Sequence, residues 1–174
     1  MEKEWFIGVD VSKATLDLAF CHVNNPNQFV YCHFENGTSG FKKMLTWLKK
    51  QGITTQNSFF CMEHTGHYTL ALCCFLQDEN LLFTLVSPLH LKKTLGITRG
   101  KNDKLDAKRI SQFTFLHRHL LKPMRMPSAC LLKLKNLMTF RDRLVKTNTS
   151  LKNAIQDLKN ILDLVDNSFI IKQS

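Results

Sequence analysis

Residues 5–12, WFIGVDVS, decide the fold expected of this chain. They form an apolar run suited to a buried β-strand, yet Asp10 stands inside it. A carboxylate in such a place is costly unless it is paired, hydrogen-bonded or bound to a metal. An aspartate that turns to solvent at the end of the strand is the alternative. For Asp10 alone both interpretations remain open.

The segments that follow predict two more strands, at residues 15–23 and 28–35. Both alternate in part between apolar and polar residues, and residues 24–27, NNPN, are turn formers. Connections this short favour an antiparallel meander of three strands.

Beyond this meander, helix and strand patterns alternate. Apolar spacing near 3.6 residues predicts helices at residues 38–52, 68–76 and 103–120, and short apolar runs predict buried strands at 58–62 and 81–86. In the last of these helices the side chains expected to face the core are Leu105, Ile110, Phe113 and Leu116. The order is βββαβαβα. With right-handed crossovers it predicts an α/β fold with a mixed five-stranded sheet, in which strand one is central and strand four lies beside it.

Three further acids are expected near the carboxyl ends of the parallel strands, where open α/β sheets hold their functional sites. Glu63 ends the fourth strand, at the same sheet edge as Asp10, and Asp103 and Asp106 share one face of a helix at a spacing of three. Singly, Glu63 could be an acid in the first turn of a helix, and Asp103 and Asp106 a capping pair. Together, each pair at about 5 Å would repel by about 3 kcal/mol at an effective dielectric of about 20. A divalent cation, Mg²⁺ or Mn²⁺, relieves this repulsion, and two such ions suit phosphoryl transfer.

The charge of the chain is uneven. Its net charge is +10, but residues 1–90 have a balance of −2 and residues 91–174 a balance of +12. This asymmetry favours a nucleic-acid partner, with a solvated basic face as the alternative. The basic residues expected to bind nucleic acid near the acids are Lys13, Arg99, Lys101, Lys104, Lys108 and Arg109. Six cysteines without zinc-like spacing, and the lack of a signal or membrane-spanning run, favour a cytoplasmic protein. With a nucleic-acid partner, we expect it to be bacterial and associated with the nucleoid.

The pattern changes after Pro123 and Pro127. A heptad repeat runs from Cys130 to Val165, with Arg141 and Asn148 as polar interruptions at a positions. It predicts a long α-helical coiled coil; an amphipathic helix that lies back on the domain is the alternative.

Three motifs point to a known family: residues 6–13, FIGVDVSK; 62–68, MEHTGHY; and 96–109, GITRGKNDKLDAKR. They closely resemble the DEDD transposases of the insertion-sequence one-ten family, relatives of the Piv and MooV DNA invertases. The helical stretch 131–162 also resembles the segment that follows in that family. The resemblance implies a ribonuclease-H-like (RuvC-like) domain over residues 1–122, with Asp10, Glu63, Asp103 and Asp106 as the catalytic, metal-binding tetrad. It also implies DNA recombination, a structured guide RNA, and a coiled coil at 128–174 that joins two or more copies.

Members of the family continue into a second domain that carries a serine nucleophile, and no serine here stands in such a context. We therefore expect this chain to bind nucleic acid without recombining DNA alone. The alternatives are a nuclease similar to Holliday-junction resolvases, or a non-catalytic module that dimerises and binds nucleic acid. An actin-like or sugar-kinase-like fold is disfavoured because the chain lacks a second, similar half and glycine-rich nucleotide loops.

Overall fold

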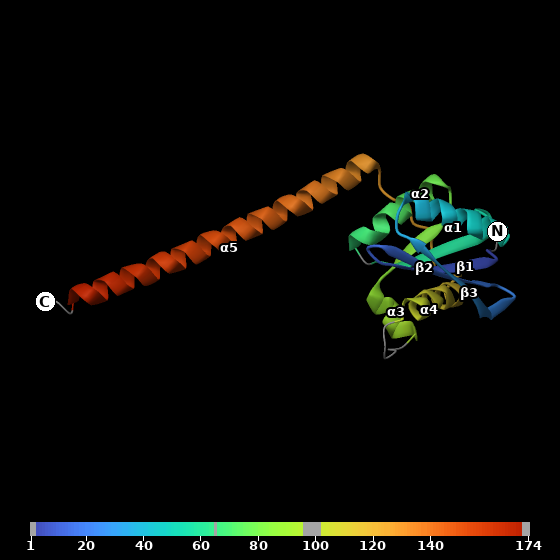
Figure 1. The fold of residues 1–174 in the computed structure, drawn as a ribbon, viewed down its shortest axis with the longest axis horizontal. Coiled ribbons are helices and arrows are strands. Elements are labelled where there is room, and N and C mark those ends of the chain that lie inside the picture. The colour runs from blue at the N-terminus through green and yellow to red at the C-terminus, as the bar shows by residue number, and fades with distance from the viewer. Residues whose placement is uncertain (1–2, 65, 96–101, 172–174) are drawn as a thin grey trace. The chain divides into compact units, whose positions relative to one another are not determined.

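The structure, a computed structural model, describes residues 3–64, 66–95 and 102–171 (Figure 1). Its internal contacts divide the chain into two units, Met1–Met126 and Pro127–Ser174. No helix in the described part of the chain is long and apolar enough to cross a membrane.

The first unit is built on a five-stranded sheet of order β3-β2-β1-β4-β5. The strands are β1 Trp5–Val11, β2 Thr15–His22, β3 Asn25–Glu35, β4 Ser58–Glu63 and β5 Phe83–Val86. β1, β2 and β3 form an antiparallel meander, and β4 and β5 continue the sheet parallel to β1. The predicted mixed sheet, with strand one at its centre and strand four beside it, is therefore confirmed.

Helices cover both faces of this sheet (Figure 1). On one side lie α1 Thr38–Lys50 and α2 Leu70–Asp78, the latter preceded by the 3-10 turn η1 Gly66–Thr69. On the other lie α3 Pro88–Leu95 and α4 Asp103–Leu116. The main core packs between the sheet and the first pair of helices, and a smaller cluster lies between the sheet and the second pair.

Several predicted boundaries are wrong. β3 begins at Asn25, so the turn before it is only two residues long, and Pro26 is accommodated because β3 is an edge strand. α3 was not predicted. Pro88 occupies its first helical position, where proline is favoured because no backbone N–H is needed there. α2 begins at Leu70 rather than at residue 68, and α4 ends at Leu116 rather than at residue 120.

The packing of α4 on β1 rests on small residues. A Cβ atom on Gly8 would lie 2.2 Å from the backbone nitrogen of Ser111 and 2.5 Å from the carbonyl oxygen of Ala107. Both Ala107 and Ser111 are fully buried, and Ser111 Oγ donates a 2.8 Å hydrogen bond to the carbonyl of Phe6. The backbone of α4 therefore lies directly against β1, and this contact sets the distance between the acids that the two elements carry.

Two of the four side chains predicted to face the core from α4 do not. Ile110 and Phe113 are buried, but Leu105 and Leu116 are 40% and 53% exposed. The face that α4 buries instead includes Ala107, Ser111 and Thr114. A face of small residues is what the close approach to β1 requires.

In the described part of the second unit the chain forms a single helix, α5 Ala129–Ile171. Within the chain as a single copy, its apolar heptad side chains are between 52% and 66% exposed: Leu134, Leu137, Leu144, Leu151, Ile155, Leu158 and Leu162. The side chain of Val165, the last residue of the predicted repeat, lies outside the described residues.

Candidate metal centre

Two of the predicted acids are placed by neighbouring parallel strands. The register of β1 on β4 pairs Gly8 with Cys61 and Val9 with Met62, so the next step brings Asp10 beside Glu63. Cys61 packs with Ile110 of α4. Side chains two residues apart on a strand face the same side of the sheet, so Glu63 faces α4 as Cys61 does. Asp10 and Glu63 thus lie at the carboxyl ends of their strands, on the face that α4 covers.

The other two acids are in the first turn of α4. The residue that caps the helix is Asn102, whose side-chain oxygen accepts a 3.3 Å hydrogen bond from the backbone N–H of Leu105. The alternative in which Asp103 is the N-cap is therefore wrong. Because Asn102 satisfies the end of the helix, the carboxylates of Asp103 and Asp106 remain available for other partners.

Three of the four carboxylates converge. Asp10, Asp103 and Asp106 each offer an oxygen, and these atoms all lie within 4.8 Å of one another. Burial, followed by repulsion from Asp106, Asp103, Glu63 and Asp17, raises the pKa of Asp10 to about 6. Glu63 lies outside the group of three, but burial and the charge of Asp106 raise its pKa as well.

Cations partly offset this negative charge. Arg109 lies one turn along α4, with Nη1 4.0 Å from Oδ1 of Asp106. Lys92 of α3 lowers the pKa of Glu63, against the effect of burial. These two cations and the two acids line a small cavity between α3 and α4. Lys92 was not among the predicted site residues because it lies on α3, which was not predicted.

The remaining basic candidates have different surroundings. Lys13 is exposed in the turn between β1 and β2, three residues after Asp10. Lys104 is exposed, with Nζ 5.1 Å from the centroid of the Tyr31 ring, whereas Lys108 is half-buried. Arg99 and Lys101 lie outside the described residues.

A fifth acid near this centre was not predicted. Asp17 of β2 stands directly opposite Asp10 in the β1–β2 register and is only 4% exposed. Its Oδ1 accepts a hydrogen bond from the hydroxyl of Tyr31 and lies 3.1 Å from Nδ1 of His33. The bond to Asp17 raises the pKa of Tyr31 to about 12. The sequence does hold a signal for this arrangement, because Asp10 and Asp17 are equally distant from the middle of the short turn between their strands.

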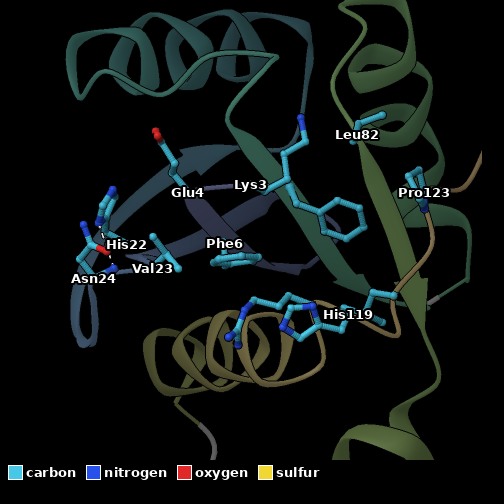
Figure 2. Close-up of a pocket in the computed structure, with 12 residues that line it drawn as sticks. Lys3, Glu4, Phe6, His22, Val23, Asn24, Leu82, His119 and Pro123 are labelled. Carbon is cyan, nitrogen blue, oxygen red and sulfur yellow. Dashed lines mark hydrogen bonds between the residues drawn. The ribbon is translucent and has the colours of Figure 1, made fainter. Parts of the chain in front are cut away.

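A larger cavity, of about 590 Å³, lies elsewhere (Figure 2). Its lining comes from the opposite ends of the same elements: Lys3 and Glu4 precede β1, and Arg118 and His119 follow α4. Of the predicted site residues that the structure describes, none lines it. The acids therefore form a separate centre, at the carboxyl ends of β1 and β4.

The sheet order and the acids at the carboxyl ends of β1 and β4 define a ribonuclease-H-like domain with an acidic centre. Among solved structures, the chain is similar to RuvC of Thermus thermophilus in complex with a Holliday-junction substrate. The TM-score is 0.50 and the identity 12%, over 70% of this chain and 99% of that one. A second Thermus thermophilus RuvC structure matches with a TM-score of 0.49, at 12% identity, over 69% and 99% of the two chains. The first of these two matches shows a RuvC-like fold.

The family follows from the sequence match. Residues 7–164 match the model of the DEDD transposases of insertion sequence IS110, described as a transposase. The chain belongs to this family. No curated protein matches it significantly.

Proposed function

We propose that residues 1–122 form the metal-dependent nuclease domain of a DNA transposase or site-specific recombinase, with Asp10, Glu63, Asp103 and Asp106 as its metal-binding and catalytic residues. The observation that carries the proposal is the convergence of three carboxylates within 4.8 Å. Such a cluster is costly by itself, as the raised pKa of Asp10 indicates. An all-oxygen donor set fits Mg²⁺ or Mn²⁺.

The bound ion would be held by Asp10, Asp103 and Asp106, with Glu63, whose pKa the charge of Asp106 raises, as a further carboxylate. When bound, it would supply a Lewis acid for the phosphoryl group that is transferred. The protein's own contribution is orientation: β1 fixes Asp10, and the first turn of α4 presents Asp103 and Asp106 to it. Lys13, Arg99, Lys101, Lys104, Lys108 and Arg109 would bind phosphates of the same nucleic acid around this centre.

The test is a calorimetric titration with Mn²⁺. Wild type should bind the ion, and Asp10→Asn should lose that binding. Asp78→Asn is the matched control, since it makes the same charge change at an exposed position at the end of α2. Equal affinity in all three proteins would refute the assignment of the metal centre.

Activity is tested separately, with supercoiled plasmid and Mg²⁺ or Mn²⁺. The nuclease proposal expects metal-dependent nicking that Asp10→Asn abolishes. Metal binding without nicking would support the alternative of a non-catalytic nucleic-acid-binding module. A four-way junction should be included as a substrate, because the RuvC structure that resembles this chain holds a Holliday junction. Cleavage confined to the junction would favour a function similar to that resolvase.

The partners follow from charge and from the second unit. The +12 balance after residue 90 supports binding to DNA and to a structured guide RNA. The exposed apolar seam of α5 supports a coiled coil over residues 128–174 that joins two or more copies of the chain. Gel-shift titrations with duplex DNA and with a structured RNA test the proposed binding of nucleic acid. Binding that does not weaken with salt would contradict it.

A further inference from the structure

Asp17 is a buried carboxylate that the metal centre does not use. It is only 4% exposed and faces the same side of the sheet as Asp10, its register partner on β1. A carboxylate in this position requires hydrogen-bond donors. It has the hydroxyl of Tyr31 and the ring of His33, both on β3. Asp17 therefore fixes two side chains of the edge strand.

The ring of Tyr31 in turn faces α4. Nζ of Lys104 lies 5.1 Å from the ring centroid, within the range of a cation–π contact. Lys104 follows Asp103 directly and is exposed. A chain of contacts thus runs from the buried carboxylate on β2, through the aromatic ring on β3, to an ammonium group at the rim of the acidic cluster.

The position of Lys104 is otherwise unfavourable. A cation in the first turn of a helix opposes the helix dipole, and a long exposed side chain loses rotamer freedom when it is held in one place. The face of the Tyr31 ring, oriented by its bond to Asp17, offsets part of both costs. The hydroxyl is also what distinguishes Tyr31 from a phenylalanine at this site, because it anchors the ring to the sheet.

We propose that Tyr31, anchored by Asp17, is a positioning residue that holds the ammonium group of Lys104 beside the carboxylate centre, where Lys104 binds a backbone phosphate of the nucleic acid. The inference rests on the proposed function, since it assumes a nucleic-acid substrate at this centre. Tyr31 acts only through Lys104 and touches neither the metal nor the reacting phosphate. Its effect on binding therefore depends on the presence of the lysine.

The experiment is a double-mutant cycle in the full chain, read as the affinity for duplex DNA across a salt series. Lys104→Ala should weaken binding about eightfold at 0.1 M salt and reduce the slope of log K against log salt by about 0.9, the value of one phosphate contact. Tyr31→Leu should weaken binding about two- to fivefold, as expected for loss of an exposed cation–π contact. Tyr31→Phe, which keeps the ring but loses the anchor, should fall between wild type and Tyr31→Leu.

The decisive comparison is the double variant. When Lys104 is already alanine, Tyr31→Leu should cause no further loss of affinity. Lys43→Ala on α1, across the sheet, makes the same charge change, and Tyr31→Leu should keep its full effect in that background. Equal losses from Tyr31→Leu in the wild-type and Lys104→Ala backgrounds would overturn the proposal, since they would show a merely structural role.

An NMR measurement without nucleic acid separates this inference from the proposed function. The ε-methylene protons of Lys104 should be shifted upfield by the ring of Tyr31, and Tyr31→Leu should abolish that shift. If the shift is present but the chain binds no nucleic acid, the proposed function fails while the contact stands. If the shift is absent in wild type, the positioning proposal fails whatever the chain binds.

Discussion

Gly8→Ala tests whether the approach of α4 to β1 builds the acidic centre. The new methyl carbon would lie 2.2 Å from the backbone nitrogen of Ser111, whereas ordinary contact begins at 3.4 Å. α4 must therefore retreat by about 1.2 Å, because the clashing atoms are backbone and no side chain can rotate away. Overpacking of this kind costs about 1–3 kcal/mol, which lowers the melting temperature by about 4–12 °C for a domain of this size.

The same retreat separates Asp10 from Asp103 and Asp106, which move together on α4. The oxygen of Asp10, which now lies within 4.8 Å of theirs, would move to as much as about 6 Å away. Two oxygens bound to one Mg²⁺ lie no more than about 4.2 Å apart, since each bond is about 2.1 Å long. We therefore expect Gly8→Ala to lower Mn²⁺ affinity by about 10- to 100-fold, the range typical of lost support around a metal site.

The assays are thermal unfolding and Mn²⁺ calorimetry, with Gly37→Ala as the matched control. A Cβ atom on Gly37 would meet nothing within 4 Å, and the backbone there is extended, so alanine fits without strain. Gly37→Ala should change the free energy of unfolding by less than about 1 kcal/mol and leave Mn²⁺ affinity unchanged. Wild-type stability and Mn²⁺ affinity in Gly8→Ala would refute the close packing of α4 on β1.

Two further predictions concern the pH dependence of stability and the second unit. The pKa of Asp10 is raised to about 6 in the folded chain, so its charge destabilises the metal-free protein at pH 7, and this destabilisation disappears as the pH falls through 6 towards 4. Asp10→Asn should therefore stabilise the metal-free chain at pH 7 by about 1–2 kcal/mol after allowance for solvent screening, and by little at pH 4, as measured by urea unfolding; a mutant no more stable than wild type at pH 7 would contradict this. On α5, Leu151→Glu at a d position should convert the oligomer to a monomer in light scattering, whereas Asn153→Glu, outside the seam, should not; identical masses for both variants would exclude the coiled coil.

The sheet could be predicted because its order follows from local alternation and a handedness rule. Three strands with short turns, then strands separated by helices, leave β1 at the centre and β4 parallel to it. The positions of Asp10 and Glu63 at one edge follow directly. α3 was not predictable in the same way, because its eight residues make only about two turns and Pro88, which begins it, can equally follow the end of a strand. The small cavity beside Glu63, and the contribution of Lys92 to it, were missed together with that helix.

The errors on α4 have a different physical cause. Apolar periodicity assumes that a helix packs through large side chains, which predicts that Leu105 and Leu116 are buried. α4 instead approaches the sheet through Ala107 and Ser111, which pack onto a glycine, so Ile110 and Phe113 are buried while Leu105 and Leu116 remain exposed. This close approach also brings the two acids of its first turn within reach of Asp10.

The role of Asp17 could not be predicted from a sequence motif. Its register opposite Asp10 could be worked out from the turn between their strands, but its role depends on β3, which lies beyond it in the sheet. β3 is an edge strand whose residues are mostly half-buried or exposed, so Tyr31 and His33 look like ordinary surface positions in the sequence. Only the pairing of β2 with β3 shows that both side chains meet a buried carboxylate. The role of a polar residue inside an apolar strand therefore depends on its partners on the neighbouring strands. Those partners determine whether its charge binds a metal ion, as we propose for Asp10, or orients a neighbouring side chain, as we propose for Asp17.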